Sequence, residues 1–309
     1  MQTIGSTGNA QVEPTIVGVK KSYPVTNLVQ PKLLRVYDGK GPYGEFGSEE
    51  NLIKHLETLD DEALRKLSHL YEVMTNVKGG WEFTDTLYRD QPQTELDKYV
   101  YNLKLCRAVW NRKNVVREQL LKSMREKLGK GGFSVDTPME IFDLGSGPSD
   151  YTIEAFETYK TRYNGHGLPV HATAIDTNKS ALERGRKLAK EAGVRKNIDF
   201  KIGNMGPMLK YGEIKDADMI LTIGIICPLP DEKVMKLFTR SRNALKKGGT
   251  FYTCAVRHHP LEKVLNNAGW LLNPREPEYL ERMMKEAGYE TEIYLDAEEF
   301  FVMGLGQKT

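Results

Sequence analysis

The 309-residue sequence predicts an α/β fold: a doubly wound, seven-stranded, mostly parallel sheet, preceded by an N-terminal helical cap. From residue 139 onward, short apolar runs alternate with amphipathic helical segments. Such alternation is typical of parallel strands joined by right-handed crossovers. The last two runs are separated by only a short connection, so we expect them to pair as an antiparallel closing hairpin. Before residue 139, apolar residues recur with helical spacing instead.

Seven apolar runs are candidate strands. They span residues 139–144, 169–175, 198–202, 218–224, 249–256, 289–295 and 299–305. The intervening segments carry helical patterns, for example in residues 179–193 and 231–249. The strand-rich domain is therefore expected to cover residues 135–309.

Two further segments precede this domain. Residues 1–47 contain scattered glycine and proline without a sustained period, which predicts an irregular N-terminal arm. Residues 48–134 carry helical patterns and predict a helical cap. Ser48 is placed to cap the first helix, and apolar residues at three- and four-residue steps predict a second helix over 61–77.

A longer helix is expected after an interruption at residues 78–93. Thr94 and Asp97 form the pattern of a capping box, with aspartate in the place of the usual glutamate. This helix is predicted to run to about Leu128, where the glycine-rich residues 129–132 end it.

Charge and composition limit the function classes. The chain has 44 basic and 42 acidic residues, without the basic excess typical of nucleic-acid-binding proteins, so nucleic acid is not the expected partner. Three widely separated cysteines match no metal-ligand spacing and indicate a reduced interior without a metal. The polar N-terminus lacks a signal-peptide core, and the apolar run 219–229 is too short to span a bilayer. We therefore expect a cytoplasmic protein without a transmembrane segment, and the oligomeric state stays open.

The turn after the first predicted strand carries the strongest chemical signal. Its sequence, GSGPSD (145–150), places two glycines where the backbone can approach a nucleotide. Such folds bind ligands at this edge of the sheet. The dinucleotide pattern G-x-G-x-x-G fails at Asp150, and the phosphate loop GxxxxGK[ST] is absent. A tight turn without a ligand is the alternative interpretation.

Together, the motifs resemble those of class I S-adenosylmethionine-dependent methyltransferases. The run IFDLGSGPS (141–149) is similar to the first motif of that family, with Ser149 in place of a glycine, and ATAID (172–176) is similar to its acidic second strand end. The resemblance covers about residues 135–309 and implies a Rossmann-like fold with S-adenosylmethionine as cofactor. Residues 258–290 also resemble an uncharacterised bacterial group of methyltransferases.

The resemblance implies roles for residues at the strand ends. Asp176 would accept hydrogen bonds from the ribose hydroxyls, with a helix N-cap as the alternative role. Asn204 would bind the adenine amine through its amide oxygen, although the family usually has aspartate there. Asp143 would reach the methionine ammonium, directly or through water.

A glycine-rich backbone, an apolar strand end and an arginine complete the expected cofactor site. These candidates are Gly145, Ser146, Gly147, Ile223 and Arg112. Arg112 precedes the first strand, where it could bind the cofactor carboxylate bidentately. Arg107 and Arg117 are rivals for this role, and a solvated helix face is the alternative for all three.

Two histidines are the candidate catalytic residues. His258 and His259 follow the fifth strand, above the expected methyl end of the cofactor, and imidazole titrates near neutral pH. His259 is preferred because Pro260 fixes its turn. A helix-start pair bonded to nearby backbone is the alternative.

The fourth strand end indicates the acceptor by what it lacks. Residues 224–233 (GIICPLPDEK) carry no (Asn/Asp)-Pro-Pro-aromatic motif of nucleobase-amine enzymes. They also lack the Asp-x-Pro-Cys that accompanies a Thr-Cys pair, here Thr253–Cys254, in RNA cytosine-C5 enzymes. The segment instead resembles small-molecule and lipid-type members of the family, with a neutral, apolar wall.

We therefore expect in-line methyl transfer to a small-molecule or lipid-like acceptor, with alignment supplying most of the catalysis. The resemblance implies that the helical cap, residues 48–134, serves as a substrate lid. Four aromatic residues of the cap could line the acceptor pocket or form core: Trp81, Phe83, Tyr88 and Tyr99. An RNA or protein methyltransferase is one alternative. A non-catalytic cofactor-binding or interaction module is the other.

Overall fold

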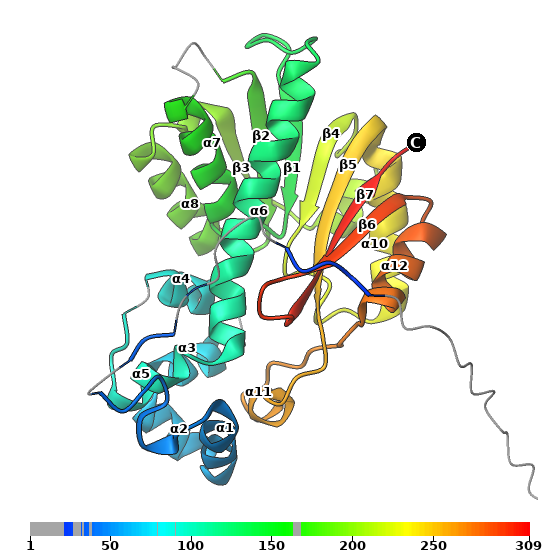
Figure 1. The fold of residues 1–309 in the computed structure, drawn as a ribbon. Helices are drawn as coiled ribbons and strands as arrows, with labels where there is room; N and C mark the ends of the chain where they lie inside the picture. The colour runs from blue at the N-terminus through cyan, green and yellow to red at the C-terminus, as the bar shows by residue number, and fades with distance from the viewer. Residues whose placement is uncertain are drawn as a thin grey trace, which may run out of the picture.

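A seven-stranded sheet forms the centre of the molecule (Figure 1). The computed structural model describes residues 22–26, 32, 34–36, 39–78, 80–89, 91–162 and 168–309. The strands are β1 (Met139–Leu144), β2 (Val170–Asp176), β3 (Ile198–Ile202), β4 (Ala217–Thr222), β5 (Leu245–Val256), β6 (Glu290–Leu295) and β7 (Phe301–Gln307). Their order is β3-β2-β1-β4-β5-β7-β6, with β7 antiparallel to both neighbours and all other pairs parallel. The predicted doubly wound sheet and its antiparallel closing hairpin are confirmed.

Helices cover both faces of the sheet, as the alternation of side chains along a strand requires. In β1, Met139 and Ile141 join one core cluster, whereas Leu144 joins the other. The first cluster lies under α6 (Lys104–Gly129), α7 (Asp150–Arg162) and α8 (Lys179–Glu191). The second lies under α9 (Met205–Lys210), α10 (Asp231–Ala244) and α12 (Pro277–Glu286). Short elements η2 (Arg195–Asn197) and α11 (Glu262–Asn267) complete this part of the chain.

The N-terminal helices gather beyond one end of the sheet (Figure 1). They are η1 (Gly44–Phe46), α1 (Glu49–Thr58), α2 (Asp61–Leu67), α3 (His69–Val77), α4 (Trp81–Arg89) and α5 (Glu95–Val100). Ser48 caps α1 as predicted, because its hydroxyl accepts from the Asn51 amide at 3.2 Å. The buried side chains of these helices belong to the same core cluster as those of α6 and α7. The cap therefore shares one hydrophobic core with the sheet.

The helix predicted over 61–77 is two helices, so that prediction is wrong. Ser68 interrupts it, because its hydroxyl donates to Asp97 at 2.6 Å and accepts from the Tyr71 amide at 3.1 Å. The segment 78–93, expected to be irregular, contains α4. Its missed signal is the pair Phe83 and Leu87, which lie four residues apart and are both buried.

The long helix predicted from Thr94 to Leu128 is also interrupted. Its capping box is present as predicted, but α5 ends at Val100 and α6 begins at Lys104. Asn102 lies in the break and exchanges two 2.9 Å hydrogen bonds with the backbone of Arg35. A tertiary contact with the arm thus overrides local helix propensity.

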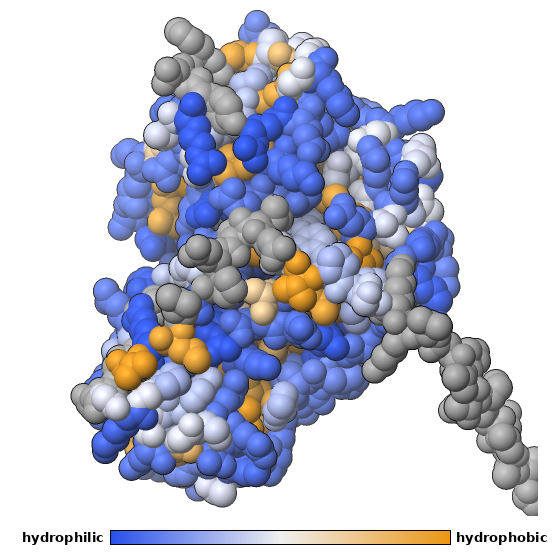
Figure 2. Space-filling model, in the orientation of Figure 1, coloured by the Kyte–Doolittle hydropathy of each residue, from blue (hydrophilic) through white to orange (hydrophobic). Residues whose placement is uncertain are grey.

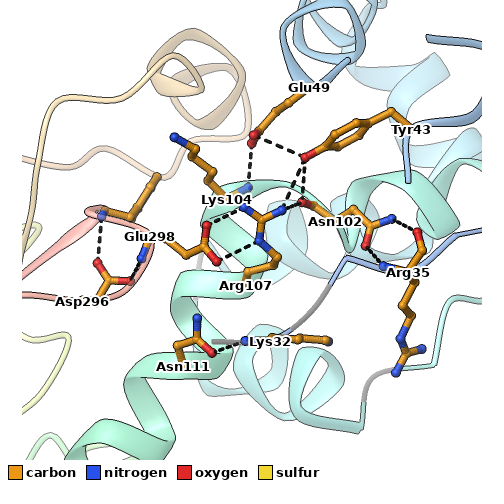
Figure 3. Close-up of polar contacts among 11 residues, drawn as sticks. Lys32, Arg35, Tyr43, Glu49, Asn102, Lys104, Arg107, Asn111, Asp296 and Glu298 are labelled. Carbon is orange, nitrogen blue, oxygen red and sulfur yellow. Dashed lines mark hydrogen bonds and ion pairs between the residues drawn. The ribbon is translucent and has the colours of Figure 1, made fainter. Parts of the chain in front are cut away.

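The start of α6 links the cap to the closing hairpin (Figure 3). Arg107 binds the carboxylate of Glu298 through two nitrogens, one at 2.9 Å, and both side chains are 9% exposed. The same guanidinium donates to the Asn102 carbonyl at 2.9 Å. The bidentate pair thus connects the cap to the hairpin, and removal of either member would leave the other charge buried without its partner.

Described residues of the arm lie against the outer edge of β6. The Thr26 amide donates to the Leu295 carbonyl at 2.8 Å, and the Leu295 amide donates to the Pro24 carbonyl at 2.9 Å. Much of the predicted irregular arm, residues 1–47, lies outside the described residues.

The face in Figure 2 is mainly hydrophilic, with separate small hydrophobic patches. Among the large apolar side chains that the structure describes, the exposed ones are scattered along the chain and include Val36, Val135 and Leu271. No helix in the described ranges combines the length and the apolar character needed to cross a membrane.

Candidate functional site

A cleft of about 330 Å³ opens at the carboxyl ends of β1, β2, β4 and β5, facing α4 and α6. The sheet order separates β2 and β1 from β5 and β7 by β4, so the strand ends supply two distinct regions. We call Gly145, Ser146, Gly147, Asp150 and Asp176 the polar end. We call Val256, Trp270, Leu272, Phe300 and Phe301 the apolar end.

The loop between β1 and α7 exposes its backbone to the polar end. Gly145 and Gly147 have φ values of 63° and 55°, in the left-handed region that favours glycine. The Gly145 amide donates to the Ile175 carbonyl at 2.7 Å, which ties the loop to β2. A Cβ atom on Gly145 would lie 2.0 Å from Cδ1 of Ile225, so no side chain fits there.

Asp176 ends β2 and orients the loop. Its Oδ2 accepts from the Gly147 amide and its Oδ1 from the Asn178 amide, both at 2.8 Å. Helix α8 is capped by Asn178, so the alternative role of Asp176 as that cap is wrong. Each carboxylate oxygen retains a further lone pair, and Asp176 lines the cleft.

Asp143 lies beneath the loop, outside the cleft lining. Its carboxylate is fully buried and accepts from the hydroxyls of Ser149 at 2.5 Å, Tyr151 at 2.7 Å and Thr152 at 3.2 Å. Burial raises the pKa of Asp143 to about 6, although these three hydroxyls act in the opposite direction. The structure thus brings Asp143 to the underside of the glycine loop.

Asp150 reaches the cleft instead. It is the first residue of α7 and lines the polar end. Burial raises its pKa to about 6, and the nearby Lys113 opposes this shift. Sequence reasoning treated Asp150 only as the residue that breaks the dinucleotide pattern. Its position directly after the loop was the available signal.

Arg112 lies in the cleft between the two ends. Its guanidinium carbon is 4.8 Å from the centre of the Phe301 ring, in a cation–π arrangement. A Cβ atom on Gly224 would lie 3.4 Å from Nη1 of Arg112. Within the described part of the chain, Arg112 makes no ion pair.

The rival arginines are engaged elsewhere. Arg107 pairs with Glu298, and Arg117 pairs with Glu118 at 3.0 Å and with Glu154 at 3.4 Å. Neither lines the cleft. Of the three candidates, the geometry therefore favours Arg112 as the residue available to an anionic ligand.

Of two other predicted cofactor residues, Ile223 lines the cleft and Asn204 does not. Ile223 follows β4 and lines the cleft between the polar and apolar ends. Asn204 does not line it; its side chain caps α9 by accepting from the Gly206 amide at 3.0 Å. The amide oxygen that was expected to reach adenine is thus already bonded.

The two candidate catalytic histidines lie outside the cleft lining. The His258 side chain is 70% exposed, and its Nδ1 is 2.9 Å from Oε1 of Glu262. His259 stacks on Phe300 with ring centres 4.6 Å apart. Burial lowers the pKa of His259 to about 4, so its ring is neutral at pH 7.

Aromatic side chains that sequence reasoning missed form the wall of the apolar end. Trp270 packs edge-to-face on Phe83 with ring centres 5.3 Å apart. Phe300 and Phe301 follow a turn fixed by Asp296, whose carboxylate accepts from the Phe300 amide at 2.7 Å. Of the four aromatics proposed from sequence, Trp81 and Tyr88 line the cleft, whereas Phe83 and Tyr99 do not.

The cysteines near the cleft differ in access. Cys254 and its neighbour Thr253 are fully buried in β5, and the Gly224 amide donates to the Cys254 sulfur at 3.3 Å. Cys227 lines the cleft. In the ranges that the structure describes, no three His, Cys, Asp or Glu side chains are grouped to hold a metal ion.

Comparisons with known proteins agree with the geometry of the fold. A family model described as a methyltransferase domain matches residues 136–290. A possible exported protein from Bordetella parapertussis is similar in structure, with a TM-score of 0.58, 17% identity, and coverage of 74% of this chain and 79% of that one. The CMeT domain of the citrinin polyketide synthase has a TM-score of 0.50 and 17% identity, covering 80% of this chain and 67% of that one. No curated protein matches the sequence significantly.

Proposed function

The chain belongs to the methyltransferase domain family, and we propose that it transfers the methyl group of S-adenosylmethionine to a small-molecule or lipid-like acceptor. The observation that carries this proposal is the meeting of a glycine loop, the Asp176 carboxylate and the Arg112 guanidinium in one cleft. A carboxylate suits ribose hydroxyls, and a guanidinium suits the carboxylate of a methionine group. Gly145 and Gly147 carry no side chain, so the backbone of the loop lines the cleft directly.

In the proposed complex, each residue of the polar end has a separate task. Asp176 accepts from the ribose hydroxyls while it also holds the Gly147 amide. Asp150 accepts from the methionine ammonium, and Arg112 donates to the carboxylate. Asp143 acts from below, because its bonds to Ser149 and Tyr151 fix the loop.

The other candidates have weaker parts in this arrangement. Ser146 and Gly147 supply backbone at the polar end, and Ile223 supplies an apolar contact between the two ends. Asn204 would have to give up its bond to Gly206 before it could reach adenine. We therefore leave Asn204 out of the principal binding set.

When bound, S-adenosylmethionine supplies a methyl group already activated by a sulfonium, which suits in-line displacement. The residues of the cleft then act mainly by alignment. Burial raises the pKa of Tyr88 to about 12, so its phenol stays protonated at neutral pH. For an acceptor that must lose a proton, His259 remains the first candidate base and the exposed His258 the second. Phe300 lines the cleft, whereas the His259 ring stacked on it does not.

Calorimetric titration with S-adenosylmethionine and S-adenosylhomocysteine tests the donor site. We expect saturable binding that Asp176→Ala weakens by about 10- to 100-fold, since two hydrogen bonds to a charged group are lost. Asp199→Ala is the matched control, because its side chain is 70% exposed on the neighbouring strand β3. Absence of binding by the unmodified protein at millimolar ligand would overturn the donor assignment.

Transfer of tritium-labelled methyl groups tests the acceptor class. Pools of small metabolites, lipids, RNA and protein are incubated separately with the enzyme and labelled donor. We expect label in the metabolite or lipid pool, and at least about tenfold less label with Asp176→Ala when the donor concentration is below its Kd for the unmodified protein. Label confined to RNA or protein would contradict the proposed acceptor while leaving methyl transfer itself intact.

A further inference from the structure

The apolar end of the cleft has a composition that defines a ligand. We propose that it binds an uncharged, ring-bearing small molecule, which lies against Trp270 and Phe300 and is the methyl acceptor. This inference rests on the proposed function, because it names the acceptor class of the same site.

Charge is distributed unevenly along the cleft. The charged residues that line it are Lys78, Arg112, Asp150 and Asp176. Asp150 and Asp176 belong to the polar end, and Arg112 lies between the ends. Lys78 is exposed, so water solvates its ammonium group. Arg112 lies over the Phe301 ring, but the proposed function assigns its guanidinium to the donor carboxylate. With Arg112 so engaged and Lys78 solvated, a ligand charge buried at the apolar end would lose its hydration without a lining charge to compensate it.

The rings of the apolar end are held in fixed orientations. Trp270 is half-buried and braced edge-on by Phe83 at 5.3 Å. Phe300 is stacked on His259 and meets Phe301 edge-on, with ring centres 5.2 Å apart and planes at 69°. Rigid ring surfaces favour a planar ligand, because stacking and edge contacts add attraction beyond simple burial.

The backbone also contributes to this rigidity. Asp296 accepts from the amides of Glu298 at 3.1 Å, Phe300 at 2.7 Å and Phe301 at 2.5 Å, which fixes the turn that precedes both phenylalanines. Behind Phe300, both ring nitrogens of His259 are buried without a hydrogen-bond partner among the described residues, and burial lowers the pKa of His259 to about 4, so this ring is neutral at pH 7. The wall is thus uncharged, aromatic and pre-formed, which reduces the ordering cost of binding.

Three probes separate the properties claimed for the ligand. 2-Naphthol is neutral and planar, 2-naphthoate is planar but anionic, and 1-dodecanol is neutral but flexible. Each is titrated calorimetrically into the full-length protein saturated with S-adenosylhomocysteine. We expect 2-naphthol to bind at least about tenfold more tightly than either of the others.

Two of the three tryptophans of the chain provide matched variants. Trp270→Leu removes the ring at the apolar end and should weaken 2-naphthol about tenfold, whereas Trp270→Phe should restore binding to within about threefold. Trp110→Leu makes the same chemical change outside the cleft lining and should leave 2-naphthol binding unchanged. All variants are titrated with S-adenosylhomocysteine as well.

The outcomes distinguish this inference from the proposed function. If S-adenosylhomocysteine binds but 2-naphthol does not bind at millimolar concentration, the inference fails and the donor site stands. Equal or tighter binding of 2-naphthoate overturns the claim of an uncharged ligand. If 1-dodecanol binds more tightly than 2-naphthol and Trp270→Leu does not change its affinity, the claim of a ring-bearing ligand is wrong and the site binds an alkyl chain. Failure of S-adenosylhomocysteine itself to bind rejects the function and the inference together.

Discussion

The polar end of the cleft comes mostly from one continuous stretch of chain, whereas the apolar end is assembled from distant segments. Residues 145–150 supply all of the polar end except Asp176. The apolar end combines the end of β5, the segment after α11 and the start of β7, which meet because Val256 pairs with Phe301. A short motif thus supplies most of the polar end, with Asp176 and Arg112 added from β2 and α6, whereas the apolar end depends on the complete topology. The two can therefore change independently.

The largest effect should follow from a side chain in the polar-end loop. Gly145→Ala would place its Cβ 2.0 Å from the Ile225 side chain, at a φ of 63°. We expect S-adenosylhomocysteine affinity to fall by about 100-fold and the free energy of unfolding to fall by about 3 kcal/mol. Calorimetry and urea unfolding measure these quantities.

Gly147→Ala is the control for that substitution. Its Cβ would lie 3.4 Å from the Trp81 Cβ, an ordinary contact, so only the backbone strain at φ 55° remains. We expect a loss of about 1 kcal/mol in the free energy of unfolding. If Gly145→Ala and Gly147→Ala lowered the affinity for S-adenosylhomocysteine equally, the clash with Ile225 would not be the cause of the loss.

Replacement of Arg112 tests the residue that lies between the ends. Arg112→Gln should weaken S-adenosylhomocysteine by about 30-fold, since about 2 kcal/mol of charge-assisted hydrogen bonding is lost. Binding of 5′-methylthioadenosine, which lacks the amino-acid group, should change by less than about twofold. Arg117→Gln, on the same helix but outside the cleft lining, should affect neither ligand. Equal losses for both ligands would contradict the carboxylate assignment.

The pH dependence of binding tests Asp150. Its pKa of about 6 means that acidification from pH 7.5 to 5 protonates most of this carboxylate, so S-adenosylhomocysteine affinity should fall about tenfold. Asp150→Asn should remove this dependence, whereas Asp143→Asn should leave it in place. A titration series with 5′-methylthioadenosine should be flat over the same range.

The same pKa predicts an effect of opposite sign on stability. The folded pKa of Asp150 lies above the usual value of about 3.9, so the native state binds the proton more tightly, and stability falls as the pH rises from about 4 through 6. Asp150→Asn should therefore raise the free energy of unfolding at pH 7.5 by about 1 to 2 kcal/mol and give no gain below about pH 4. A destabilised variant at pH 7.5 would show that Asp150 is instead well paired in the native state.

The smallest effect is expected at the apolar end. Leu272→Ala removes a half-buried side chain there and should change S-adenosylhomocysteine affinity by less than about twofold, because distant sites contribute independently. In the double variant Leu272→Ala/Asp176→Ala, the loss in binding free energy for S-adenosylhomocysteine should equal the sum of the losses in the two single variants. A coupling above about 0.5 kcal/mol would show that the two ends act as one unit.

The positions of the strands along the chain and the glycine loop were predictable from local signals. Alternating apolar runs located every strand, and the capping box at Thr94 was correct. The breaks in the cap helices were not predictable, because Ser68 and Asn102 act through partners 29 and 67 residues away. Long-range side-chain contacts leave no periodic trace in the sequence.

The site shows the same limit at the level of single residues. Asp143 and Asp150 flank one loop, yet only the folded chain shows that Ser149 and Tyr151 cover the first while the second lines the cleft. Trp270 and Phe300 belong to no sequence motif. They line the apolar end only because the fold brings β5 and the closing hairpin together. Proximity across a sheet, unlike proximity along the chain, requires knowledge of the topology.

The pairing of the arm with β6 has a consequence for association between molecules. β6 ends the sheet, and an open strand edge invites pairing with the edge of another copy, a common route to aggregation. Here Pro24 and Thr26 already occupy both backbone groups of Leu295, and proline has no amide hydrogen to offer a further strand. Residues 24–26 of the arm thus cover the β6 edge at Leu295, where a strand of another copy can no longer pair.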